Sequence, residues 1–87
     1  MTDIQDAAST AVLRSGLAGT TMSVSDLWVS ATGIGGAMRK ADVTDITDGG
    51  RPATSAEHDI LATALNDWFC DHGMDHPVAL WEGLVPA

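Results

Sequence analysis

Residues 54–73, TSAEHDILATALNDWFCDHG, carry the clearest structural signal in this chain. Thr54 and Glu57 have the spacing of a capping box, which marks the first turn of a helix. Apolar pairs then recur every four residues and share one helical face: Ile60, Leu61, Ala64, Leu65, Trp68 and Phe69. Gly73 suits a left-handed C-terminal cap. The pattern predicts an amphipathic helix over residues 55–72.

A helix is also predicted near the amino terminus, over residues 3–15. Thr2 and Gln5 have capping-box spacing, and Gly16 is a reasonable stop. The apolar positions at helical spacing are mostly alanines: Ile4, Ala7, Ala8, Ala11 and Val12. Such a helix would pack closely but gain little free energy per residue.

A third helix is predicted over residues 24–38, starting at a Ser23–Asp26 capping pattern. Its apolar face combines Val24, Leu27, Trp28, Ala31, Ile34 or Gly35, and Met38. The glycines at 33, 35 and 36 weaken the prediction, because glycine costs about 1 kcal/mol relative to alanine inside a helix. Either the helix continues through them because another backbone approaches closely, or it ends near Thr32.

The remaining segments are a polar connector and an apolar tail. Within residues 39–54, one or two helical turns around Val43 and Ile46 would end at Gly49. The tail from Met74 could begin a short helix at Pro77. Its apolar side chains either cover the core or form a docking patch: Val78, Leu80, Trp81, Leu84 and Val85.

Together these signals predict an all-α fold, a small bundle of three main helices forming one domain over residues 1–87. A short acidic turn is expected between the second and third helices, and a carboxy-terminal segment is expected to wrap over the core. The predicted centre of the core contains Leu27, Trp28, Ile60, Leu61, Ala64, Leu65, Trp68 and Phe69.

The charge balance limits the possible partners. The 87 residues contain 12 acidic and 4 basic side chains, so the formal net charge is −8 with neutral histidines. Nucleic-acid binding and docking on an anionic membrane both need clustered Lys and Arg, so we expect neither. A basic protein partner fits the acidic exterior better.

Cellular context is suggested by three further features. Cys70 is the single cysteine and cannot form an internal disulfide. The first residues are acidic rather than basic and apolar, unlike a secretory signal. No stretch approaches the roughly 20 apolar residues of a membrane-spanning helix. We therefore expect a cytoplasmic protein.

Two residue patterns could carry chemistry, and each has a simpler structural interpretation. Gly33-Ile34-Gly35 begins a dinucleotide fingerprint, but Met38 stands where its third glycine belongs and no βαβ unit follows. The acids at 42, 45 and 48 lack the alternating ligands and terminal glutamate of a calcium loop. We interpret the glycines as a turn or close packing, and the acids as helix-capping or solvated groups.

The metal-capable residues concentrate between positions 70 and 76. Cys70, His72 and His76 could supply thiolate and imidazole ligands to zinc. A structural zinc site normally needs four ligands, and His58 is the one other histidine in the chain. A small metal-binding protein is therefore the alternative, while our leading prediction includes no metal site and no cofactor.

Catalytic residues are not predicted. A Ser–His–Asp or Cys–His set needs a pocket as well as the residue types, and 87 residues leave little room for one. The acids that flank His58 are expected in a first helical turn on dipole grounds alone.

Several short motifs between residues 26 and 78 resemble a type of small actinobacterial protein without assigned function. They are Asp26-Leu27-Trp28, Gly35-Gly36, His58-Asp59-Ile60-Leu61-Ala62, Ala64-Leu65-Asn66, Gly73 and His76-Pro77-Val78. The resemblance implies a cytosolic bacterial protein and supplies neither an activity nor site residues. Our functional prediction is a non-enzymatic interaction or regulatory module, with self-association as one form of it. Trp81, Leu84 and Val85 are its candidate partner-binding residues.

Overall fold

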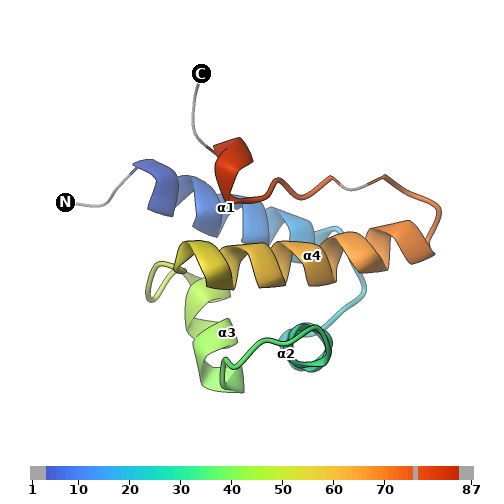
Figure 1. Ribbon diagram of the computed structural model, residues 1–87, viewed down its shortest axis with the longest axis horizontal. Helices are drawn as coiled ribbons and strands as arrows, with labels where there is room; N and C mark the ends of the chain where they lie inside the picture. The colour runs from blue at the N-terminus through green and yellow to red at the C-terminus, as the bar shows by residue number, and fades with distance from the viewer. Residues whose placement is uncertain (1–3, 76, 85–87) are drawn as a thin grey trace.

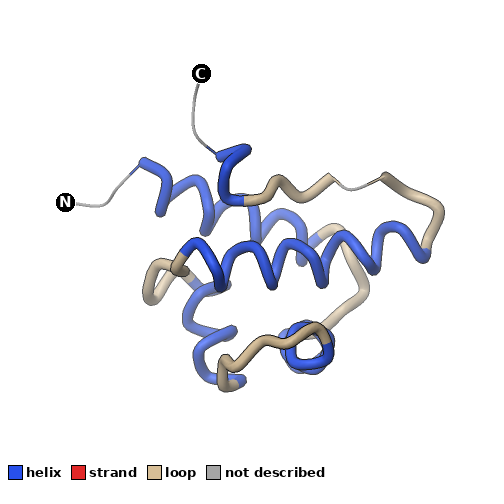
Figure 2. Tube along the Cα trace, in the orientation of Figure 1, coloured by secondary structure: helices blue, strands red, loops and turns tan. Residues whose placement is uncertain are grey.

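Four α-helices and one short 3₁₀-helix form the part of the chain that the structure, a computed structural model, describes: residues 4–75 and 77–84 (Figure 1). In chain order they are α1 Ile4–Ala18, α2 Val24–Gly33, α3 Lys40–Asp48, α4 Ser55–Asp71 and the 3₁₀-helix η1 Trp81–Leu84. Within those residues there is no strand, as Figure 2 shows. The predicted all-α class is confirmed, although with four helices rather than three.

Helix α4 is the central element of the bundle. It contacts α1, α2 and η1, while α3 packs against α1 and α2. Figure 1 shows α1 and α4 lying lengthwise beside each other, and the chain after α4 returning along that helix towards η1. Among the described helices, none combines the length and the apolar character needed to cross a membrane.

Helix α4 forms as its sequence predicts. The Thr54 hydroxyl accepts from the Glu57 amide at 3.1 Å, and the Glu57 carboxylate accepts from the Thr54 amide at 2.9 Å. The helix ends at Asp71, and Gly73 adopts a left-handed φ of 78°. Its buried face includes four predicted core residues: Leu61, Ala64, Leu65 and Phe69.

Three residues of the predicted list, Trp28, Ile60 and Trp68, are packed against the core rather than at its centre. The indole N–H of Trp28 donates to the Met38 carbonyl at 3.0 Å, so this ring lies where a polar partner is in reach. Trp68 stacks on the His72 ring with centroids 3.8 Å apart. The fully buried large apolar side chains are instead Leu13, Leu27, Val43, Ile46, Leu61 and Leu65.

Helix α1 differs from its prediction in both length and orientation. It continues through Gly16 to Ala18 and buries Ser9 and Leu13, whereas Ile4 is 73% exposed. A stripe of alanines differs little in hydrophobicity from the other faces, so the sequence did not identify the buried side. The Thr2 half of the predicted capping box lies outside the described residues.

Helix α2 ends at Gly33, which agrees with the alternative that ends near Thr32 and shows that the extension to residue 38 is wrong. The Ser23–Asp26 capping box is present, with Leu27 and Ala31 buried on the predicted face. Beyond the helix, the Gly36 amide donates to the Ala31 carbonyl at 2.9 Å, and a Cβ on Gly36 would lie 2.8 Å from that oxygen. A glycine at 36 therefore permits this close approach as the chain leaves the helix.

The predicted acidic turn is a complete helix, α3, which accounts for the fourth element. Val43, Ile46 and Thr47 are buried along it, and Gly49 caps it with a left-handed φ of 83°. Only two apolar residues, Val43 and Ile46, marked this helix in the sequence, so its predicted length was too short. The third buried residue is the polar Thr47, whose hydroxyl donates to the Val43 carbonyl within the helix.

Candidate functional site

The chain after α4 returns across the bundle, and we call residues 77–84 the return segment. The short helix suggested to begin at Pro77 does not form there; residues 77–80 are not helical, and η1 begins at Trp81. The return segment is fastened by side chains of α1 and α4 that bond to its backbone at Val78, Ala79 and Trp81.

His58 is the most deeply buried of these fasteners, with no exposed surface. Its Nε2 lies 2.7 Å from the Ala79 carbonyl, and its Nδ1 lies 2.7 Å from the Ser9 hydroxyl. A carbonyl can only accept, so Nε2 carries a proton; in the neutral ring Nδ1 then accepts from Ser9. One imidazole thus connects α1, α4 and the return segment, and the Trp81 ring covers it edge-on at 5.8 Å between centroids.

A serine hydroxyl beside a histidine is also the geometry of a nucleophile and its base. Catalysis would require a substrate to reach the Ser9 oxygen, but both Ser9 and His58 are completely buried. The third partner is the Ala79 carbonyl instead of a carboxylate. The pair therefore acts as a structural connection between elements.

Asn66 is the second buried fastener on α4. Its amide nitrogen donates to the Val78 carbonyl at 2.9 Å, and its oxygen accepts from the Val78 amide at 2.9 Å. One side chain thus satisfies both backbone groups of a residue that is only 4% exposed. The hydrophobic pattern of α4 leaves a polar residue such as Asn66 on the outward side, but the structure buries it.

Two bonds fix the backbone at Trp81, the first of the predicted partner-binding residues. The Asp59 carboxylate accepts from its amide at 2.8 Å, and the Gln5 amide nitrogen donates to its carbonyl at 3.1 Å. Trp81 is half-buried, and Leu84 is only 8% exposed because it packs within the bundle. Val85 lies outside the described residues.

Leu80 is the apolar side chain that the return segment leaves outside, with 49% of its surface exposed. It borders a groove of about 550 Å³ between α4 and the return segment, which we call the acidic groove. The residues lining it are Thr63, Asn66, Asp67, Val78, Ala79, Leu80, Glu82 and Gly83. The sequence places Leu80 in the apolar tail but does not distinguish it as a partner-binding residue, because nothing in the tail indicates which of its side chains face outward.

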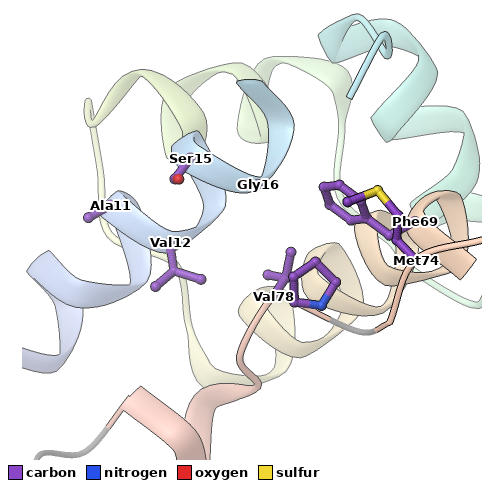
Figure 3. A pocket seen from close by; sticks show the side chains of 8 residues that line it. Ala11, Val12, Ser15, Gly16, Phe69, Met74 and Val78 are labelled. Carbon is purple, nitrogen blue, oxygen red and sulfur yellow. The ribbon is translucent and has the colours of Figure 1, made fainter. Parts of the chain in front are cut away.

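A second groove, of about 420 Å³, lies on the α1 side of the return segment. Figure 3 shows Ala11, Val12 and Ser15 on α1 at one side, with Phe69 and Met74 opposite and Val78 between. Its lining contains no ionisable group, so this groove has no chemistry beyond apolar contact and the Ser15 hydroxyl.

Arg39 and Arg51 form a local cluster of ion pairs near the amino-terminal end of α4. Arg51 donates to both Glu57 oxygens, at 3.0 and 2.8 Å, and Arg39 donates to Asp42 at 3.1 Å. The Arg51 hydrogen bonds hold the pKa of Glu57 below its ordinary value, and the Arg39 hydrogen bonds do the same for the pKa of Asp42. These pairs brace the starts of α3 and α4.

The candidate metal ligands are not brought together in the described part of the chain. Cys70 and His72 are both exposed and lie two residues apart at the end of α4, where side chains do not face each other. His72 Nδ1 is 2.7 Å from the Trp68 carbonyl, and His76 lies outside the described residues. Within residues 4–75 and 77–84, no group of three metal-capable side chains occurs.

Comparison with protein-family models, with curated proteins and with solved structures finds no match for this chain. The resemblance to small actinobacterial proteins therefore stays a prediction from the sequence motifs.

Proposed function

We propose that this protein is a non-enzymatic interaction or regulatory module of the bacterial cytoplasm, which binds a partner protein through the acidic groove. Leu80 is the observation that carries the proposal. Its side chain is half exposed, while hydrogen bonds hold the backbone on both sides of it, at Ala79 and at Trp81. A contact residue held in place before binding loses little conformational entropy when the partner arrives.

The fasteners of the return segment support the same interpretation. Ser9, His58 and Asn66 are buried polar side chains, and burying them would cost free energy without their hydrogen-bond partners. Their hydrogen bonds, together with the apolar contacts, hold the return segment in one position against the bundle. The rigid surface that results includes Leu80 and the adjacent half-buried Trp81.

Self-association is the second form of this proposal, and it would use a different surface. Two acidic grooves brought face to face would repel each other. Residues 27–38 contain no charged side chain and include the exposed Val29 and Ile34, so a homodimer would form more readily there.

The test combines sedimentation with affinity capture from a lysate of the source organism. Immobilised wild-type protein and Leu80→Ser would be compared with Val29→Ser, a matched change of another exposed apolar side chain. We expect a protein retained by wild type and by Val29→Ser but lost with Leu80→Ser. A strict monomer that retains no protein, or retains the same proteins with both variants, contradicts the proposal.

A further inference from the structure

We propose, resting on the function above, that the acidic groove receives a basic amphipathic helix of a partner protein, which places an apolar side chain on Leu80 and its Lys or Arg side chains against the acids of α4. The inference depends on the apolar groove together with the distribution of charge around it.

The charge distribution is strongly one-sided. Residues 52–87 contain no Lys or Arg but six acids: Glu57, Asp59, Asp67, Asp71, Asp75 and Glu82. Glu57 is paired with Arg51 at the start of α4. Within residues 4–75 and 77–84, no ion pair reaches Asp67, Asp71 or Glu82, so their negative charge is available to a partner.

Two acids line the groove, and a third lies beside it on α4. Asp67 and Asp71 lie four residues apart on α4 and share a face with Thr63, which also lines the groove. Asp67 and Glu82 line the groove from opposite sides. From Thr63 to Asp71 this face extends about 12 Å, which matches about eight residues of a partner helix.

The floor of the groove, away from its two acids, is mainly apolar. Val78, Ala79 and Leu80 line it, with the half-exposed Leu80 at its surface. An apolar strip bordered by one sign of charge is complementary to a helix with apolar residues on one side and basic residues beside them. Long-range attraction would also speed the encounter of such a partner.

The same charges exclude the other classes of occupant. A second copy of the chain would place acids against acids, and phosphates of nucleic acids or anionic lipids would also be repelled. An acidic peptide is excluded on the same ground. A basic polypeptide segment is the occupant that the surface favours.

The experiment selects binders from a random 16-residue peptide library displayed on phage, with the full-length protein as bait. The affinities of the selected peptides are then measured by fluorescence anisotropy. We compare Asp67→Asn/Asp71→Asn with Asp45→Asn/Asp48→Asn, since both pairs are exposed and both remove two negative charges. Leu80→Ser is compared with Val29→Ser, and circular dichroism verifies that each variant is folded.

We expect the selected peptides to carry Lys or Arg beside apolar residues at helical spacing. The Asp67/Asp71 variant should weaken binding about three- to tenfold at low salt, the range for two solvent-exposed ion pairs. Leu80→Ser should weaken it about fivefold or more through lost apolar burial. Both control variants should bind as wild type does, and added salt should reduce the affinity of wild type more than that of the Asp67/Asp71 variant.

Selection of neutral or acidic peptides, equal binding by the two double variants, or no enrichment at all would overturn the inference. Neutral or acidic peptides that lose binding with Leu80→Ser but not with Val29→Ser would overturn this inference while leaving the acidic groove in place as a docking site. The two proposals can therefore fail separately.

Discussion

The Asn66→Ala substitution tests how the return segment is held. In wild type the Asn66 side chain bonds to both the amide and the carbonyl of Val78, each at 2.9 Å. Alanine keeps the helical backbone of α4 but removes both bonds. The Val78 amide and carbonyl then either remain buried without partners or reach water by detaching the return segment.

The expected cost follows from those two bonds. A typical hydrogen bond contributes about 1 kcal/mol net, and a buried group left unpaired costs about 1–3 kcal/mol. Two groups therefore give a loss of about 2–6 kcal/mol in the free energy of unfolding. Detachment of the return segment limits this loss of free energy, because the Val78 amide and carbonyl then bond to water. A domain of this size is stable by roughly 4–13 kcal/mol, so the effect would be large.

The assay is urea unfolding followed by circular dichroism, combined with amide hydrogen exchange. We expect Asn66→Ala to unfold at lower urea concentration, and the Val78 and Trp81 amides to exchange faster than those in the middle of α4. That order would show that the return segment opens before the helices do.

Thr63→Ala is the matched control, because Thr63 lies one turn earlier on the same helix but is exposed. Its effect should stay within about 0.5 kcal/mol, as is usual for surface positions. If Asn66→Ala unfolded as Thr63→Ala does, with the Val78 amide still protected, Asn66 would not be holding the segment and our explanation would be wrong.

Three further outcomes follow from the packing and the ion pairs. Leu65→Ala should cost about 2–5 kcal/mol because this side chain is fully buried, and a melting temperature within two degrees of wild type would contradict the assigned core. Gly16→Ala should be less stable than Gly33→Ala by about 1–3 kcal/mol, since its new Cβ would lie 2.9 Å from Val78 while the one at Gly33 meets nothing; equal unfolding midpoints would disprove the clash. Arg51→Gln should lose about 1 kcal/mol near neutral pH through the broken pair with Glu57. Because Arg51 lowers the pKa of Glu57, the stability gap between wild type and variant should close as the pH falls below the ordinary carboxyl range, and a gap unchanged near pH 3 would refute it.

Helices α2 and α4 were predictable because their signals are local. The capping boxes at Ser23 and Thr54 both form, and the apolar positions of α4 repeat strongly enough to identify its buried face. A cap depends on residues three positions apart, so the sequence contains everything needed to recognise it.

The length of α3 and the buried face of α1 were not predictable in the same way. Thr47 completes the buried side of α3, and Ser9 lies at the centre of the buried side of α1. Both are polar residues that a hydrophobic pattern assigns to the surface. Specific hydrogen bonds offset the free-energy cost of burying them, and the bond at Ser9 is made to a residue 49 positions away.

The candidate site was predictable in its charge but not in its residues. The acidic excess and the apolar tail both indicated partner binding, and the prediction named Trp81, Leu84 and Val85. Leu84 is instead buried and Leu80 exposed, because the direction of each side chain depends on how the return segment is fastened to α4.

Local information in the chain thus specified where helices begin, that they form an all-α domain, and that its surface carries a strong negative charge. The folded arrangement selected which polar side chains would be buried and which apolar one would remain in water. The physical reason is the separation along the chain between the residues that interact in each case. Caps and periodicity act within one or two turns, whereas His58 and Asn66 bond to partners 12 to 49 residues away, which become neighbours after the helices have packed.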